Sequence, residues 1–341
     1  MNFSANWYAA RQTKNRDRVL IFGGYQPLFR LVTMDSMTQK KKHTEIWRPL
    51  YPFRSHFHNI NGFRMHYLDE FSGDGRSESI LFVHGNPTWS FYWRNLVIPL
   101  RKNYRCIAVD HIGCGLSDKP GDAAYPFTLQ RRIDDLCELI GRLNMKNITL
   151  VAHDWGGAVG MGAACQLSDR FSRFVLMNTG AFLSPRCPLR IRACRIPLLG
   201  RFAVQGLNAF AVAATKMAIS NRKNMTRQVR AGLLAPYNTW ANRLGVYRFV
   251  QDIPLSPKHP SYETLLNIEK QLPMFRDKPI ALLWGMQDWC FTPDFLKRFL
   301  QFYPDAETHR FDDAAHYLVE DIPERVASTI EEFTKNHPTG T

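Results

Sequence analysis

One ten-residue stretch constrains the fold of this chain more than any other feature: Ile148-Thr-Leu-Val-Ala-His-Asp154-Trp-Gly-Gly. It begins as a mainly apolar run at 148–152, as expected for a buried strand of a parallel sheet. Ala152 and Gly156 flank Asp154 at two positions on either side, and a helical pattern follows. Small flanking residues are needed where a strand turns sharply into a helix, because the two backbones approach closely. The stretch therefore predicts a turn that lifts Asp154 above a sheet, beside a helix N-terminus that favours an anion.

The turn at Asp154 has the spacing of the nucleophile elbow of α/β-hydrolases, with aspartate in the central position. The alternative is that Asp154 only caps the following helix, which is a common role for aspartate. A carboxylate with an ordinary pKa near 4 is already ionised at neutral pH. It suits displacement at an activated carbon, which produces an ester of Asp154. A histidine is then free to activate water against that ester.

Two further residues fit the partners that this elbow requires, an acid and then a histidine, in that chain order. Asp288 follows an apolar strand pattern at 280–284, and His316 follows a strand that ends near Phe311. Asp288 would hold the imidazole in the correct tautomer and stabilise its charged form. The alternatives are a loop or helix-capping aspartate before Pro293 and an exposed loop histidine.

The segment Val83-His84-Gly85-Asn86 predicts the oxyanion donors. In this fold the residue after His-Gly and the residue after the nucleophile donate backbone N–H groups, here Asn86 and Trp155. Their side chains add an amide and an indole N–H, which suit a departing halide because neither titrates near neutral pH. The alternatives are an incidental asparagine in a Gly-Pro turn and a tryptophan that only lines an apolar pocket.

Strand and helix patterns alternate from about Trp47, which is typical of a parallel α/β sheet. The alternation breaks between about Phe182 and Met274, where the sequence is helical, rich in proline and basic. We therefore expect a core of residues 46–181 and 275–341, a helical cap of residues 182–274, and an N-terminal extension of residues 1–45. Either Met34 or Met37 is a candidate for the true start of translation; the alternative is a flexible or partner-binding extension.

The net charge of +14 suggests attraction to anionic surfaces. Between Phe182 and Val250 there is no Asp or Glu but there are twelve Lys or Arg, so the excess charge concentrates in the predicted cap. A solvated basic face is the alternative.

The chain has seven cysteines, an odd number, and no CxxC motif, which favours free thiols in a reducing cytoplasm over a zinc site. No apolar run reaches the roughly 18 residues of a membrane span, and no convincing signal peptide begins the chain.

Together these residues resemble the haloalkane dehalogenase family. The matching segments are HGNPTWSFYWR (84–94), DHIGCGLSD (110–118), HDWGG (153–157), GMQD (285–288) and the loop around His316, and the resemblance covers roughly Trp47 to His337. It implies an α/β-hydrolase fold with a mostly parallel eight-stranded sheet, helices on both faces and an inserted helical cap. It also implies that Asp154 is the nucleophile, His316 the base and Asp288 the acid, with Asn86 and Trp155 binding halide.

The main functional expectation is a dehalogenase that forms an alkyl ester on Asp154 and hydrolyses it to an alcohol. The position of the acid together with Asn86 looks most like the third subfamily, which is similar to the β-lactone decarboxylases of bacterial olefin synthesis, so decarboxylation is an alternative. Epoxide hydrolysis is another; it needs acids such as the cap tyrosines Tyr237 and Tyr247. A cofactor-free oxygenase is a further alternative, and a membrane-associated scaffold is the non-enzymatic one.

The expected ligand is a small apolar or lipid-like molecule in a dry pocket between cap and core, with halide as product. No metal, organic cofactor or nucleic acid is implied. We expect a cytoplasmic protein with peripheral membrane contact or self-assembly through the basic cap.

Overall fold

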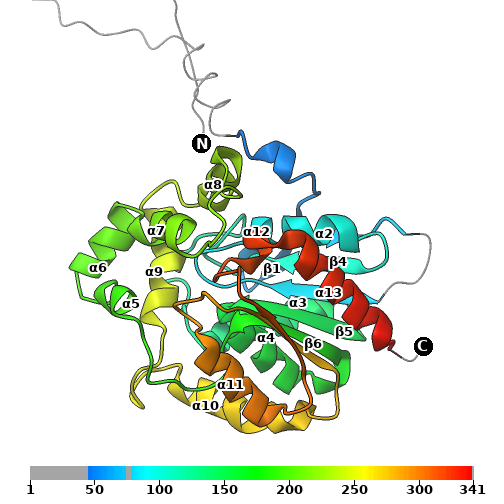
Figure 1. The fold of residues 1–341 in the computed structure, drawn as a ribbon. Helices are drawn as coiled ribbons and strands as arrows, with labels where there is room; N and C mark the ends of the chain where they lie inside the picture. The colour runs from blue at the N-terminus through cyan, green and yellow to red at the C-terminus, as the bar shows by residue number, and fades with distance from the viewer. Residues whose placement is uncertain (1–44, 74–77, 340–341) are drawn as a thin grey trace, which may run out of the picture. The chain divides into compact units, whose positions relative to one another are not determined.

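The computed structural model describes residues 45–73 and 78–339. The predicted extension of residues 1–45 lies outside the described residues except for its last residue, and so do the two candidate start sites, Met34 and Met37. The described part contains one eight-stranded sheet in the order β1-β2-β4-β3-β5-β6-β7-β8 (Figure 1). Pairing is antiparallel between β1 and β2 and between β2 and β4, and parallel elsewhere. The predicted α/β-hydrolase architecture is therefore confirmed. The strands are β1 (His56–Ile60), β2 (Phe63–Glu70), β3 (Ser79–Val83), β4 (Arg105–Val109), β5 (Ile148–Asp154), β6 (Phe171–Thr179), β7 (Ile280–Gly285) and β8 (Glu307–Phe311).

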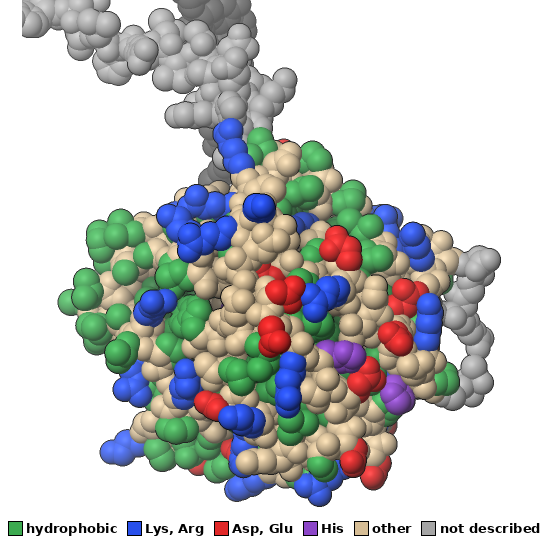
Figure 2. All heavy atoms as spheres, in the orientation of Figure 1, with side chains coloured by type: hydrophobic (Ala, Val, Ile, Leu, Met, Phe, Trp, Pro, Cys, Tyr) green, Lys and Arg blue, Asp and Glu red, His purple; other side chains and the backbone are tan. Residues whose placement is uncertain are grey.

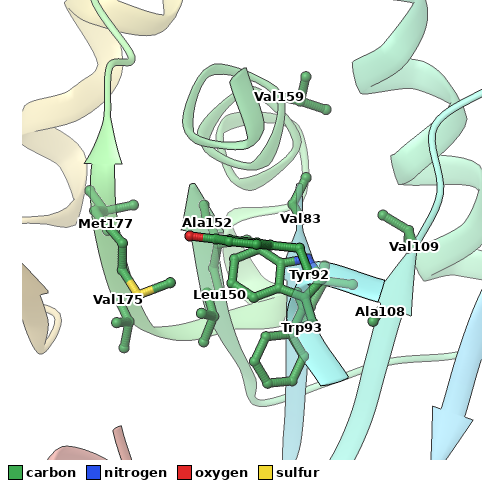
Figure 3. Close-up of a cluster of buried hydrophobic side chains, with 14 of the residues drawn as sticks. Val83, Tyr92, Trp93, Ala108, Val109, Leu150, Ala152, Val159, Val175 and Met177 are labelled. Carbon is green, nitrogen blue, oxygen red and sulfur yellow. The ribbon is translucent and has the colours of Figure 1, made fainter. Parts of the chain in front are cut away.

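Helices cover both faces of this sheet (Figure 1). On one side α2 (Arg94–Leu100) packs with α13 (Pro323–Asn336), and on the other α3 (Leu129–Arg142) packs with α4 (Trp155–Gln166). Because both faces are covered, every residue of β3, β5 and β7 is buried, which explains their mainly apolar sequences. Figure 3 shows Tyr92 and Trp93 beside the central strands that carry Val83, Leu150 and Val175.

The edge strand β1 was not predicted from the sequence. It joins β2 through a two-residue turn at Asn61 and Gly62, whose φ angles are 49° and 90°. Asn-Gly is the preferred pair for such hairpin turns, because both positions need positive φ. The pair was therefore a usable signal for this hairpin.

Between β6 and β7 the chain is helical. The elements are α5 (Leu189–Ala193), α6 (Leu199–Arg201), η4 (Phe202–Gly206), α7 (Ala209–Met217), α8 (Arg227–Leu234), α9 (Leu244–Gln251) and α10 (Tyr262–Gln271), with short η turns at 241–243 and 272–275. The last of them, α10, packs against α4 of the core (Figure 1). We call the segment from α5 to α9, residues 189–251, the cap.

Buried polar contacts fix the cap to the core. The Trp89 indole donates to the carbonyl of Gly232 at 3.0 Å, and the Tyr237 hydroxyl donates to the carbonyl of Thr88 at 3.1 Å. A buried ion pair of 3.2 Å joins Arg132 of α3 to Asp252 at the end of α9. These contacts bond α8, the loop that follows it and the end of α9 to core segments.

Three observations bear on the expected classes of site. All seven cysteines are free, as predicted. Within residues 45–73 and 78–339 no cluster of three or more His, Cys, Asp or Glu side chains is arranged to hold a metal ion. None of the helices in that same part of the chain has the length and apolar character needed to cross a membrane.

Candidate active site

The backbone at Asp154 is sharply turned, and two glycines make room for it. Asp154 ends β5 with φ 53° and ψ −128° and begins α4 directly. A Cβ at Gly156 would lie 2.0 Å from the carbonyl oxygen of Val83, and one at Gly85 would lie 2.0 Å from Asp154 Oδ1. Such positions accept only glycine, because no larger side chain fits the gap. The structure therefore places Asp154 as the elbow pattern predicts.

The Asp154 carboxylate is buried but held by donors. The backbone N–H of Asn86 donates to Asp154 Oδ1 at 2.6 Å. Burial raises the pKa of Asp154, and the His316 charge and the backbone N–H groups of Asn86 and Trp155 oppose that rise. The backbone N–H of Asn86, one of the two predicted oxyanion donors, thus binds the Asp154 carboxylate. If Asp154 forms an ester, this N–H is in place for the ester carbonyl oxygen.

His316 connects the two predicted carboxylates. Its Nε2 lies 3.6 Å from Asp154 Oδ2, and its Nδ1 lies 2.8 Å from Asp288 Oδ2. Burial lowers the pKa of His316, but the charge and hydrogen bond of Asp288 and the charge of Asp154 outweigh it, so the pKa is raised overall. The structure brings the three residues together in the geometry of a triad.

Asp288 is fixed by groups that sequence reasoning missed. Its Oδ1 accepts from the backbone N–H of Cys290 at 2.6 Å, and its Oδ2 accepts from Asn178 Nδ2 at 3.0 Å. Asn178 also accepts from the backbone N–H of Gly285 at 2.8 Å. Its only sequence signal is a polar residue directly after the apolar run Phe174–Met177.

His153 is the second missed residue. Its Nε2 lies 2.8 Å from the carbonyl oxygen of His316, so it donates to that carbonyl and fixes the loop that carries His316. Burial holds the pKa of His153 well below its ordinary value, which keeps the ring neutral. A polar residue inside the apolar run of β5 was the available signal.

The side chains of Asn86 and Trp155 differ in what they contact. Asn86 Nδ2 donates to the carbonyl of Val246 in the cap at 3.1 Å, and Asn86 Oδ1 is buried without a partner. The Trp155 ring packs on Phe249, with ring centres 5.7 Å apart. Both residues line the same cavity as Asp154 and His316.

The cavity between cap and core has a volume of about 310 Å³. Its catalytic end is formed by the core residues Asn86, Asp154, Trp155 and His316. The rest of its wall is mainly apolar, with contributions from Ile191, Phe210, Ala214, Met217, Val250, Leu265, Phe291 and Phe295. Such a wall binds a ligand by excluding water rather than by hydrogen bonds.

Neither candidate acid for epoxide opening lines this cavity. The hydroxyl of Tyr237 is buried and donates to Thr88, and Tyr247 is part of the apolar core. The structure therefore does not bring the two cap tyrosines to Asp154. Tyr317, next to the base, is the tyrosine that does line the cavity.

The raised pKa of His316 leads to a prediction about stability. A folded state with a raised histidine pKa is stabilised below the ordinary pKa of 6.5, and this stabilisation is lost as pH rises through the folded value. We expect Asp288→Asn to lower the unfolding free energy more at about pH 6 than at about pH 9. Urea unfolding of both proteins at the two pH values measures this difference. An equal loss at both values would mean that the pair does not exchange a proton on unfolding.

Comparison with known proteins agrees with this geometry. A family model described as the alpha/beta hydrolase fold matches residues 78–323. The chain is 46% identical over 288 residues to a cis-3-alkyl-4-alkyloxetan-2-one decarboxylase of Shewanella oneidensis, covering 83% of this chain and 89% of that protein. It is 29% identical to haloalkane dehalogenase 2 of Mycobacterium tuberculosis, covering 82% and 95%.

The crystal structure of a haloalkane dehalogenase from Bradyrhizobium elkani has the same fold, with a TM-score of 0.73 at 24% identity, covering 83% of this chain and 99% of that one. The architecture, the matched family model and the relative at 46% identity all point to one assignment. The chain belongs to the α/β-hydrolase fold family, in the group that contains β-lactone decarboxylases and haloalkane dehalogenases.

Proposed function

We propose that this chain decarboxylates β-lactones that carry alkyl groups on both sp³ ring carbons, giving an alkene and CO₂. The observation that carries the proposal is the similarity to a decarboxylase of such lactones, 46% identical, against 29% for the dehalogenase relative. The expected main activity, halide displacement, becomes the second candidate. The observation that favours it is that Asn86 and Trp155, which carry an amide and an indole N–H, line the catalytic end of the cavity.

The site chemistry supports lactone opening because the leaving group resembles a halide in its needs. When a nucleophile attacks the sp³ ring carbon next to the ring oxygen, a carboxylate leaves while staying attached to the substrate. A carboxylate, like a halide, needs only hydrogen-bond donors. The indole N–H of Trp155 and the amide N–H of Asn86 lie at the cavity wall beside Asp154 and supply them.

The proposed reaction has two balanced steps. First, Asp154 forms a C–O bond to the ring carbon as the ring C–O bond breaks, which leaves an alkyl ester of Asp154 and a free β-carboxylate. Second, the bond between that carboxylate and the neighbouring carbon breaks. Its electron pair forms the C=C bond and expels Asp154 as a carboxylate, and CO₂ departs. No water is consumed and Asp154 is regenerated.

His316 and the apolar wall have separate roles in this scheme. The protonated imidazole, stabilised by Asp288, lies next to Asp154 and favours its departure as an anion. The dry wall favours loss of CO₂, because a carboxylate that is poorly solvated releases its charge more readily. Asp154, His316 and the cavity are thus used without an additional acid or metal.

The test is to supply the full-length protein with a cis-dialkyl β-lactone and measure alkene by gas chromatography, beside bromide release from bromoalkanes of matched length. We expect alkene formation to exceed bromide release by at least roughly tenfold in kcat/KM, since opening the four-membered lactone ring releases strain that a bromoalkane lacks. Asp154→Asn should abolish alkene formation, and Asp305→Asn, an exposed carboxyl after α11 (Pro293–Phe302), is the control for the same change of side chain away from the cavity. Bromide release without alkene would overturn the proposal and restore the dehalogenase assignment.

A further inference from the structure

A cluster of large apolar side chains is exposed on the cap. Within the described residues, eleven large hydrophobic side chains are exposed, and seven of them lie between Leu189 and Trp240. Figure 2 shows hydrophobic side chains gathered at the left of the view, where Figure 1 places α6 and its neighbours. We call these seven the apolar cap surface: Leu189, Ile196, Leu198, Leu199, Phe202, Leu207 and Trp240.

Leu198 is the most exposed residue of this surface, and its backbone has an unfavourable conformation. Leu198 is 85% exposed and has φ 60° and ψ −57°, a conformation that a leucine rarely adopts. Its neighbour Leu199 is 62% exposed. The backbone strain and the exposure of apolar side chains to water are both unfavourable, so an environment that accepts apolar side chains would stabilise this turn.

The charges around the apolar cap surface are of one sign. No Asp or Glu occurs between Phe182 and Val250. The exposed guanidinium of Arg201 lies 5.9 Å from the ring centre of Trp240, and Arg190 and Arg192 are exposed on α5. Two acids of the core pair with this region: Asp122 with Arg201 and Arg248, and Asp294 with Arg186 at 3.7 Å. Arg190 and Arg192, beside the exposed Leu189, form no ion pair with any acid in the part of the chain that the structure describes.

We propose that the apolar cap surface binds an anionic lipid bilayer at its interface. Apolar side chains that enter the acyl boundary, next to Arg and Lys that meet anionic headgroups, are the combination that interfacial binding needs. The N-terminal 44 residues are a poor alternative occupant. They contain eight Lys or Arg and only two Asp, so their charge repels this surface.

The position of the surface also suggests how an alkyl substrate reaches the site, a consequence that rests on the proposed function. Helix α5 carries Leu189 on its exposed side, whereas its Ile191 lines the cavity. The exposed residue Arg190 lines the cavity as well. One short helix therefore separates the catalytic cavity from the proposed bilayer. A lipid-like substrate can pass between the two without crossing water.

Vesicle co-sedimentation with the full chain tests the binding without reference to activity. The probes are vesicles of phosphatidylcholine with phosphatidylglycerol in equal parts and vesicles of phosphatidylcholine alone. We expect binding to the anionic vesicles, weakened at least about tenfold by Leu198→Ser with Leu199→Ser and Phe202→Ser. We expect Arg192→Gln to weaken it about fivefold. The matched control is Ile98→Ser with Phe57→Ser, which removes exposed apolar side chains from the core.

Circular dichroism and thermal unfolding establish that each variant is folded. Equal vesicle binding by the cap variant and the control would overturn the proposal and assign any binding to the N-terminal segment. If the wild type ignores both vesicles but the cap variant forms smaller particles in analytical ultracentrifugation, the surface is a protein interface and the proposal is wrong. If alkene formation fails while vesicle binding follows the cap residues, only the proposed function is overturned.

Discussion

Replacing Asp154 by asparagine is expected to abolish turnover. The amide keeps the size of the side chain and an oxygen that accepts from the Asn86 N–H, so the fold and the cavity are retained. It cannot form the ester, however, because a neutral amide is a far weaker nucleophile than a carboxylate. We expect the rate of alkene formation to fall by roughly 10⁴-fold or more, as for loss of other enzymatic nucleophiles. Gas chromatography of the alkene measures the loss.

Isotope labelling of the same residue separates the two candidate reactions. In H₂¹⁸O, hydrolysis of an alkyl ester on Asp154 places solvent oxygen in its carboxylate, whereas decarboxylative expulsion returns the original oxygens. We therefore expect no ¹⁸O in the peptide that contains Asp154 after lactone turnover, as measured by mass spectrometry. Residual activity near wild type in Asp154→Asn would instead remove Asp154 from the mechanism altogether.

The largest expected effect on stability comes from Arg94→Met. Arg94 on α2 forms two bonds to Glu320, at 2.6 and 2.7 Å, and its guanidinium lies 4.2 Å from the ring centre of Phe91. Both charged side chains are almost fully buried. Removing one leaves the other uncompensated, which costs about 3–5 kcal/mol of unfolding free energy. Urea unfolding monitored by fluorescence measures this loss.

The double variant Arg94→Met with Glu320→Leu is the control for that experiment. It removes both charges and fills their space with apolar atoms, so it is expected to recover most of the lost stability. A single variant that loses less than about 1 kcal/mol would show that water reaches Glu320 when its partner is gone.

The parts of the site that lie in one segment were predictable. The elbow around Asp154 needs small residues at fixed spacing, and the order of acid and histidine follows from the strand order of the fold. Asp288 and His316 were found in this way, and the structure places them within hydrogen-bond reach of each other. Most strands were found for a similar reason, since burial on both faces leaves continuous apolar runs.

What the sequence could not provide are contacts between distant segments. Asn178 acts on Asp288 across 110 positions, and Asn86 bonds to Val246 across 160. The sequence around one partner gives no sign of the other, because only the packing of the strand ends and the cap brings the two residues of each pair together. The sequence also could not decide between a lactone and a halide substrate, since both leaving groups need the same hydrogen-bond donors. It was the relatives, rather than the motif, that favoured the lactone.

The bond from Asn86 to Val246 has a consequence for engineering. One residue supplies a backbone donor to the nucleophile and a side-chain donor to the cap, so the two parts are not independent modules. Grafting the cap of another relative onto this core would shift the carbonyl at position 246 and, with it, the alignment of the donor at position 86. Cap exchange in this scaffold would thus alter kcat along with substrate range, and a successful chimaera must carry over residues 84–89 and 244–251 as one unit.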